Sequence, residues 1–156
     1  MHIEGPHGGR DVEASEFFDT YLTSSLEAGE LLTEVRFPSA PPGAGAAFLE
    51  LVRRKGDFAI FAAAASVEMG GDGACKGARL ALAGVSDTPI RCDAPSAILV
   101  GRVPTAELLR EAASAACEGI EPESDVLASG EYRRAMAPVY ARRALASAVA
   151  RATTQS

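Results

Sequence analysis

The sequence predicts an α+β fold in which strands come first and helices follow. Two observations carry this prediction. Residues 60–68 and 78–85 are apolar segments on either side of a Gly-Gly-Asp-Gly sequence at residues 70–73, which is typical of a β-hairpin. After residue 94 the apolar residues recur at helical spacing instead. With a short third strand at residues 89–92, the order is strand-strand-strand-helix-helix-helix.

Length and composition are those of a globular chain with one core. The chain has 156 residues, of which 47% are hydrophobic and 23% are charged, and these values argue against wholesale disorder. A chain of this length forms one domain, or one domain with part of a neighbour. Aromatic residues are scarce and Ala is abundant, so we expect elements that approach one another closely.

Charge and hydropathy argue against several classes of function. The net charge of −6 is unfavourable for binding nucleic acid or an anionic membrane surface, because both depend on an excess of basic side chains. No segment approaches the ~18 consecutive apolar residues of a membrane span. Three widely spaced cysteines are expected to be reduced thiols of a cytoplasmic protein.

The first forty residues predict little regular structure. Residues 1–9 have three Gly, one Pro and no periodicity, so we expect a flexible leader. Residues 15–26 predict a short helix with Ser15 as its N-cap. Four apolar residues would share one face of this helix: Phe17, Phe18, Tyr21 and Leu22.

A strand and a loop complete this part of the chain. Residues 30–37 alternate loosely between apolar and polar side chains, and Pro38 ends the pattern. Residues 39–46 are rich in Pro and Gly, which favours a loop. This loop is the best candidate for a junction between two structural units.

Three helices are predicted in the C-terminal part. The first covers residues 94–100, and Thr105 is the expected N-cap of the second. Ser129 is the expected N-cap of the third, which runs to about residue 152. Pro138 lies inside this last helix, so we expect either a kink or two helices end to end.

No familiar catalytic motif is present. The two histidines lie within the first seven residues, and the chain has no Ser-His-Asp set, HExxH sequence or phosphate-binding loop. The basic residues 53–55 could clamp an anion or could belong to an exposed turn, and both interpretations stay open. Arg133 and Arg134 are expected on the polar face of the last helix.

Several segments resemble one known family in the order and spacing of their residues. They are residues 26–35 (LEAGELLTEV), 53–59 (RRKGDFA), 88–91 (TPIR), 99–101 (LVG) and 129–136 (SGEYRRAM). The resemblance is to the C-terminal part of the medium, FAD-binding subunit of the molybdenum hydroxylases, the carbon monoxide dehydrogenase and xanthine dehydrogenase family. It covers about residues 10–150.

The resemblance implies a fold and a set of partners. Residues 47–152 would form a domain like the C-terminal domain of the CO dehydrogenase flavoprotein, with a three-stranded antiparallel sheet packed against three helices. Residues 10–38 would be the helix-strand tail of the preceding FAD-binding domain. In that family the medium subunit passes electrons from the iron–sulfur small subunit to an acceptor, and the molybdenum cofactor lies in the large subunit.

The resemblance also implies which residues approach the cofactor. Leu31 and Leu32, together with Asp57 and Phe58 of the charged turn, would lie near the isoalloxazine ring of FAD. An aromatic side chain can stack on such a ring and shield it from water. Glu50 takes a position near the flavin where the family commonly has Lys, and an ionised carboxylate cannot donate a hydrogen bond to a flavin oxygen.

These features leave three functional hypotheses. The first is a flavin-covering part of an oxidoreductase subunit. Alone it would not hold FAD tightly, because the Gly-rich loops that bind the diphosphate in the family do not occur in this sequence. The second is a truncated assembly or interaction module that has lost FAD binding. The third is a plain α+β domain with chance similarity. Under the first two we expect exposed apolar residues, and a homodimer is possible.

Overall fold

The computed structural model describes residues 1–154 and divides the chain into two compact units. The first unit is Met1–Ala40, and the second begins at Pro41. This boundary falls within residues 39–46, which the sequence assigns to a junction loop, but residues 44–46 belong to a strand instead.

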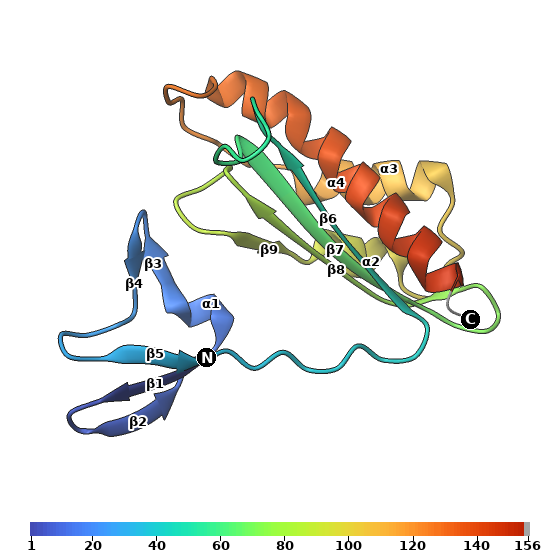
Figure 1. Ribbon diagram of the computed structural model, residues 1–156. Helices are drawn as coiled ribbons and strands as arrows, with labels where there is room; N and C mark the ends of the chain where they lie inside the picture. Colours follow the sequence, from blue (N-terminus) through green and yellow to red (C-terminus); the bar gives the residue numbers. More distant parts are fainter. Residues whose placement is uncertain (155–156) are drawn as a thin grey trace. The chain divides into compact units, whose positions relative to one another are not determined.

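The first unit is built mainly from short strands, shown in blue in Figure 1. Its elements are β1 (His2–Gly5), β2 (Gly8–Asp11), α1 (Ala14–Phe17), β3 (Phe18–Thr20), β4 (Thr23–Ser24) and β5 (Leu31–Glu34). Antiparallel pairing gives one sheet in the order β2-β1-β5, and β3 pairs with β4. A small core of Ile3, Val12 and Phe17 holds the unit together.

Two predictions for this unit are wrong. Residues 1–9 are not an irregular leader, because they contain β1 and the start of β2, which form a hairpin, and β1 also pairs with β5. Residues 15–26 are not a helix, because α1 ends at Phe17 and a second hairpin follows. The expected apolar face has too little to pack against, since only Phe17 of its four members is buried. The intervening Asp and Thr residues also have poor helix propensity.

The second unit contains a four-stranded antiparallel sheet. Its strands are β6 (Ala44–Leu51), β7 (Phe61–Met69), β8 (Cys75–Ala83) and β9 (Ile90–Cys92), in the spatial order β6-β7-β8-β9. The predicted hairpin of β7 and β8 and the short strand β9 are confirmed. The sheet has β6 in addition to the three expected strands. Its small residues, Ala44 to Ala47, hide the alternation that would have identified it.

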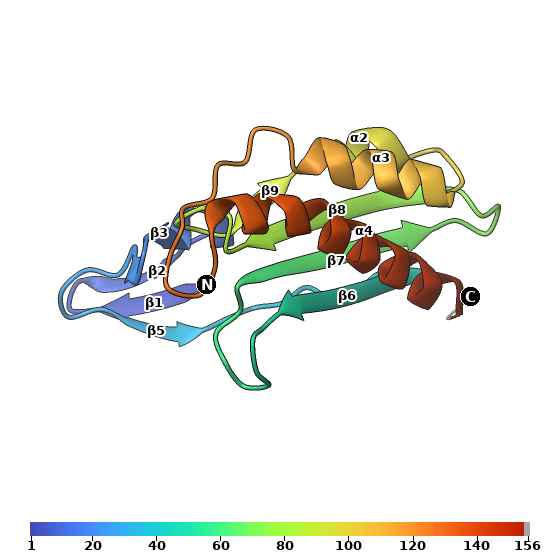
Figure 2. The ribbon, with the colours of Figure 1, turned by 90° about the horizontal axis from the view of Figure 1, so that it is seen from above.

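Three helices cover one face of this sheet (Figure 2). They are α2 (Ala94–Leu99), α3 (Ala106–Ala116) and α4 (Gly130–Thr154). Both predicted caps are present, because the hydroxyls of Thr105 and Ser129 accept the amide protons of Leu108 and Tyr132, each at 3.2 Å. α4 continues through Pro138 as one helix rather than two. The α+β class, with an antiparallel sheet against three C-terminal helices, is thereby confirmed.

Small residues let α4 lie directly on the sheet. The alanines of α4 that face β6 and β7 are fully buried: Ala137, Ala141, Ala144 and Ala148. Gly45 of β6 lies against this row, and a Cβ there would overlap the backbone of Ala148 and Ala152. The scarcity of aromatic residues therefore reflects a core in which backbones approach closely. The opposite face of the sheet has no helix over it within the described part of this unit (Figure 2).

Candidate functional site

The turn between β6 and β7 presents an aromatic side chain to solvent. We refer to residues 52–60 as the 52–60 turn. The amide of Asp57 donates to the carbonyl of Arg54 at 3.1 Å, and the amide of Ile60 donates to the carbonyl of Leu51 at 2.8 Å. Gly56 has φ +93°, a conformation that favours Gly. Phe58 is 91% exposed, so its ring is free to contact a partner or a ligand.

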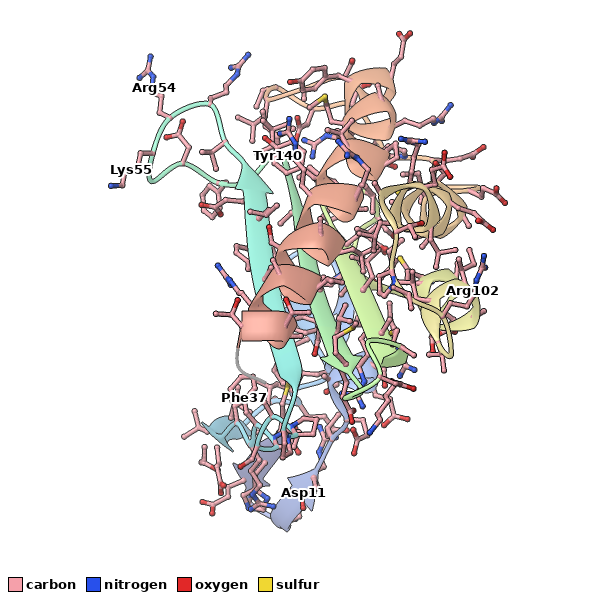
Figure 3. All side chains as sticks on the ribbon, turned by 90° about the vertical axis from the view of Figure 1, so that its right-hand side faces the viewer. Asp11, Phe37, Arg54, Lys55, Arg102 and Tyr140 are labelled. Atoms are coloured by element: carbon pink, nitrogen blue, oxygen red, sulfur yellow. The ribbon has the colours of Figure 1, made fainter. Side chains whose placement is uncertain are left out.

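Three basic residues precede that aromatic residue in the same turn. Arg53, Arg54 and Lys55 are all exposed, and Figure 3 shows Arg54 and Lys55 pointing away from the sheet. Of the two interpretations of this cluster, the structure therefore bears out an exposed turn. The exposed cations remain available to an anionic group that approaches the turn.

The open face of the sheet carries Glu50. On β6 the side chains of Ala46, Phe48 and Glu50 alternate with the buried or half-buried residues that face the helices. Glu50 is opposite Ala62 in the pairing of β6 and β7, and Phe48 is opposite Ala64. The carboxylate of Glu50 is exposed.

A shallow hollow of about 650 Å³ lies on the same face. Phe48 and several alanines form its apolar part, and Arg79, Arg91 and Arg151 contribute basic groups. Arg151 is held there because its guanidinium donates to the carbonyl of Ala46 at 2.6 Å. Sequence reasoning missed Phe48 as a surface residue, and recognition of β6 as a strand would have placed it on the open face.

In the first unit, Leu31 and Leu32 lie on β5. Leu31 is 70% exposed and Leu32 is 38% exposed, and the strand is held by pairing with Ile3 and Glu4 of β1. Both leucines therefore present apolar surface at a fixed backbone position.

An ion pair orders the loop that leads into β5. Arg10 donates to both carboxylate oxygens of Glu30 at 2.8 Å and to the carbonyl of Ser25 at 2.6 Å. The amide of Glu27 also donates to Glu30 at 2.8 Å. The hydrogen bond from Arg10, and then that from Glu27, lower the pKa of Glu30 to about 2. The carboxylate is thus charged at neutral pH and links Arg10 of β2 to the loop that leads into β5.

The five residues predicted to approach a cofactor are shared between the units. Glu50, Asp57 and Phe58 lie in the second unit, whereas Leu31 and Leu32 lie in the first. All five are exposed, as residues that contact a ligand or another domain must be. Within residues 1–154, no cluster of three or more His, Cys, Asp and Glu residues is arranged to hold a metal ion. None of the helices there combines the length and apolar character that crossing a bilayer requires.

Comparison with known proteins identifies the second unit. The family described as "CO dehydrogenase flavoprotein C-terminal domain" matches residues 46–148. The chain is 38% identical over 150 residues to the carbon monoxide dehydrogenase medium chain of Afipia carboxidovorans, covering 96% of this chain and 52% of that protein. It is 37% identical over 145 residues to the 6-hydroxypseudooxynicotine dehydrogenase complex subunit alpha of Paenarthrobacter nicotinovorans, covering 93% and 49%.

Solved structures give the same result. Quinoline 2-oxidoreductase from Pseudomonas putida 86 superposes with a TM-score of 0.89 at 36% identity, covering 97% of this chain and 52% of that one. Carbon monoxide dehydrogenase from Hydrogenophaga pseudoflava gives 0.89 at 37% identity, covering 96% and 52%. The chain spans about half the length of the curated relatives it matches. Chance similarity is therefore wrong as an explanation.

Proposed function

Because the chain belongs to the CO dehydrogenase flavoprotein C-terminal domain family and is related to medium subunits of molybdenum hydroxylases, we propose that it is the flavin-covering part of such a subunit. In this role it covers the FAD that receives electrons from iron–sulfur clusters and passes them to an acceptor. The observation that carries the proposal is Phe58, an aromatic residue 91% exposed on the turn that resembles the flavin-facing turn of the family.

The residues present suit the ring end of the cofactor. Phe58 offers an exposed aromatic face, and Leu31 and Leu32 offer exposed apolar surface, which is the chemistry that a planar, hydrophobic ring requires. FAD, when bound, supplies the redox chemistry. The side chains of this chain orient the ring and exclude water from it, and Asp57 presents a carboxylate beside Phe58. Leu31 and Leu32 are assigned this role from the family resemblance.

The proposed partners are an iron–sulfur small subunit and a molybdenum-cofactor large subunit. The relatives support this, since one is a subunit of a dehydrogenase complex and another is the medium chain of carbon monoxide dehydrogenase. We propose that the assembly works in the cytoplasm. Cys75, Cys92 and Cys117 are free thiols, as expected in a reducing compartment.

A flavin titration tests the proposal. We expect the purified chain to have no stoichiometric flavin absorbance, and added FAD to bind weakly with quenching of its fluorescence. Phe58→Ala should weaken this binding about two- to twelvefold, because aromatic stacking contributes about 0.5–1.5 kcal/mol. Val126→Ala, at another side chain that is 92% exposed, is the matched control. Equal titrations for the wild-type chain and Phe58→Ala would contradict a role for Phe58 in covering the flavin.

Glu50 favours a second candidate function, an assembly or interaction module without FAD. A carboxylate on the open face repels electron-rich flavin oxygens where a Lys would donate to them. In this case the chain would bind the partner subunits, and FAD would have no effect on that binding. Pull-down with the two partner subunits, with and without FAD, separates the two candidates.

A further inference from the structure

One buried arginine connects the last helix to the exit of the 52–60 turn. Arg133 lies in the first turn of α4, yet only 5% of the residue is exposed. The prediction that it belongs to the polar face of the helix is therefore wrong, whereas Arg134, the next residue, is exposed as expected. A buried guanidinium must be paired with acceptors, so its partners indicate what it is for.

The acceptors come from three separate segments. One nitrogen of the guanidinium, Nη1, donates to the carbonyl oxygen of Ile60 and, at 3.1 Å, to that of Gly84. The other, Nη2, donates to Oδ2 of Asp125 at 2.6 Å. Ile60 is the last residue of the 52–60 turn, and Gly84 directly follows β8. Arg133 thus fixes the point at which the turn enters the sheet.

Gly84 supports this interpretation independently. Its φ is +79°, and a Cβ at this position would lie 2.5 Å from the carbonyl oxygen of Ile60 and 3.2 Å from Nη1 of Arg133. Only Gly allows the two carbonyls to converge on one guanidinium. Both partners of this contact thus have the residue type that it requires, Arg at position 133 and Gly at position 84.

The two carboxylate oxygens of Asp125 have different partners, so the one that binds Arg133 is not shared. Its Oδ1 accepts the amides of Leu127 and Ala128 at 2.8 and 3.0 Å, which leaves Oδ2 for Arg133. The loop before α4 is therefore anchored to the same cation that binds the turn.

The 52–60 turn has little else to hold it. The amide of Asp57 donates to Arg54 within the turn, and the amide of Ile60 donates to Leu51 at the end of β6. Phe58 makes little contact with the rest of the unit because it is almost fully exposed. A ring presented to a ligand must nonetheless keep a fixed position to contribute to binding. The fixed position has to come from the ends of the turn.

We propose that Arg133 is a positioning residue that sets the location of Phe58 by binding the carbonyls of Ile60 and Gly84. That Phe58 contacts flavin rests on the proposed function. The mechanical role of Arg133, which is to hold the end of the 52–60 turn in place, does not depend on it. Arg133 acts only through the backbone of the turn.

Hydrogen exchange on the full chain tests the mechanical role. For Arg133→Gln we expect exchange at the Asp57 and Ile60 amides to be at least about tenfold faster than in the wild-type chain, with Ala112 and Ala113 of α3 unchanged. Arg133→Lys keeps the charge and the stem and should restore part of the protection. Arg134→Gln is the matched control and should match the wild-type chain.

A second variant decides the matter if Arg133→Gln does not fold. Asp125→Asn retains Oδ1 for Leu127 and Ala128 and removes only the acceptor of Arg133, so it should accelerate exchange at the same two amides by a smaller factor. Unchanged exchange there, or acceleration that is equal throughout the unit, would overturn the proposal. A wild-type chain that fails to quench FAD would instead count against the proposed function and leave the exchange result intact.

Discussion

Glu50 shows how one side chain can decide between the two candidate functions. It lies on the open face of the sheet, exposed, at the position where relatives are expected to carry Lys from the family resemblance. The residue opposite it on the neighbouring strand β7 is small, namely Ala62. A larger cationic side chain therefore fits there without disturbing the core.

We expect Glu50→Lys to tighten FAD binding about tenfold, because it replaces repulsion of flavin oxygens by a charge-assisted hydrogen bond. Stability should change by less than about 0.5 kcal/mol, as for other exposed substitutions. Fluorescence titration with FAD measures the first quantity and urea unfolding measures the second. Glu68→Lys, on the neighbouring strand β7, is the charge-matched control. No gain in affinity would favour the interaction module.

The backbones of α4 and β6 approach each other closely at Gly45. Gly45 is buried against Ala148 and Ala152, where no side chain fits. The helix can lie flat on the sheet only while this position stays empty.

We expect Gly45→Ala to destabilise the second unit by about 1–3 kcal/mol, because the added methyl group forces α4 away from β6. Gly71→Ala is the matched control, since a Cβ there meets nothing within 4 Å. Urea unfolding followed by circular dichroism gives both values. A Gly45→Ala variant as stable as Gly71→Ala would show that α4 does not pack as closely as described.

In the first unit, the entry to β5 depends on the charge of Glu30. The hydrogen bond from Arg10 lowers the pKa of this carboxyl from 4.5 to about 2 in the folded chain. Because the folded pKa is the lower one, the contribution of Glu30 to stability is complete above pH 4.5 and is lost as the pH falls towards 2.

We therefore expect the first unit to lose protection against hydrogen exchange as the pH is lowered through this window, after correction for the intrinsic exchange rate. The loss should be seen at the Glu27 amide, which donates to the Glu30 carboxylate. Glu30→Gln should have low protection at all pH values, whereas Glu13→Gln, at an exposed position, should behave as the wild-type chain. Identical pH profiles for the wild-type chain and Glu30→Gln would contradict this account.

Across the whole chain, several large apolar side chains are exposed. Those of the first unit include Tyr21, Leu22 and Leu31, and Phe37 beyond β5 is 86% exposed. In the second unit, Phe48 and Phe58 are exposed as well. Where such side chains gather into one patch, they mark a surface that a partner or another domain covers.

We expect the isolated chain to dimerise or aggregate as its concentration rises, and to become monodisperse when the partner subunits are added. Multi-angle light scattering over a concentration series measures this. Phe37→Ser should reduce the self-association, with Thr33→Ser on β5 as the control. A strictly monomeric wild-type chain at high concentration would show that these side chains do not drive association.

The sequence by itself determined the elements whose signals are local. The β7–β8 hairpin follows from the Gly-rich turn at residues 70–73, and the starts of α3 and α4 follow from the caps Thr105 and Ser129. Ordered motifs also identified the family that the comparisons confirm. These signals depend on residues that are close together in the sequence, so they can be recognised without knowledge of the tertiary structure.

Only the tertiary structure decided features that depend on distant residues. Small side chains concealed β6, and pairing with the distant strand β5 placed β1 in a sheet although its residues were expected to be irregular. Arg133 is buried because Ile60 and Gly84, which are far away in the sequence, converge on it together with Asp125 of the preceding loop. Burial and hydrogen bonding of this kind arise when the chain folds back on itself, and periodicity along the sequence does not encode them.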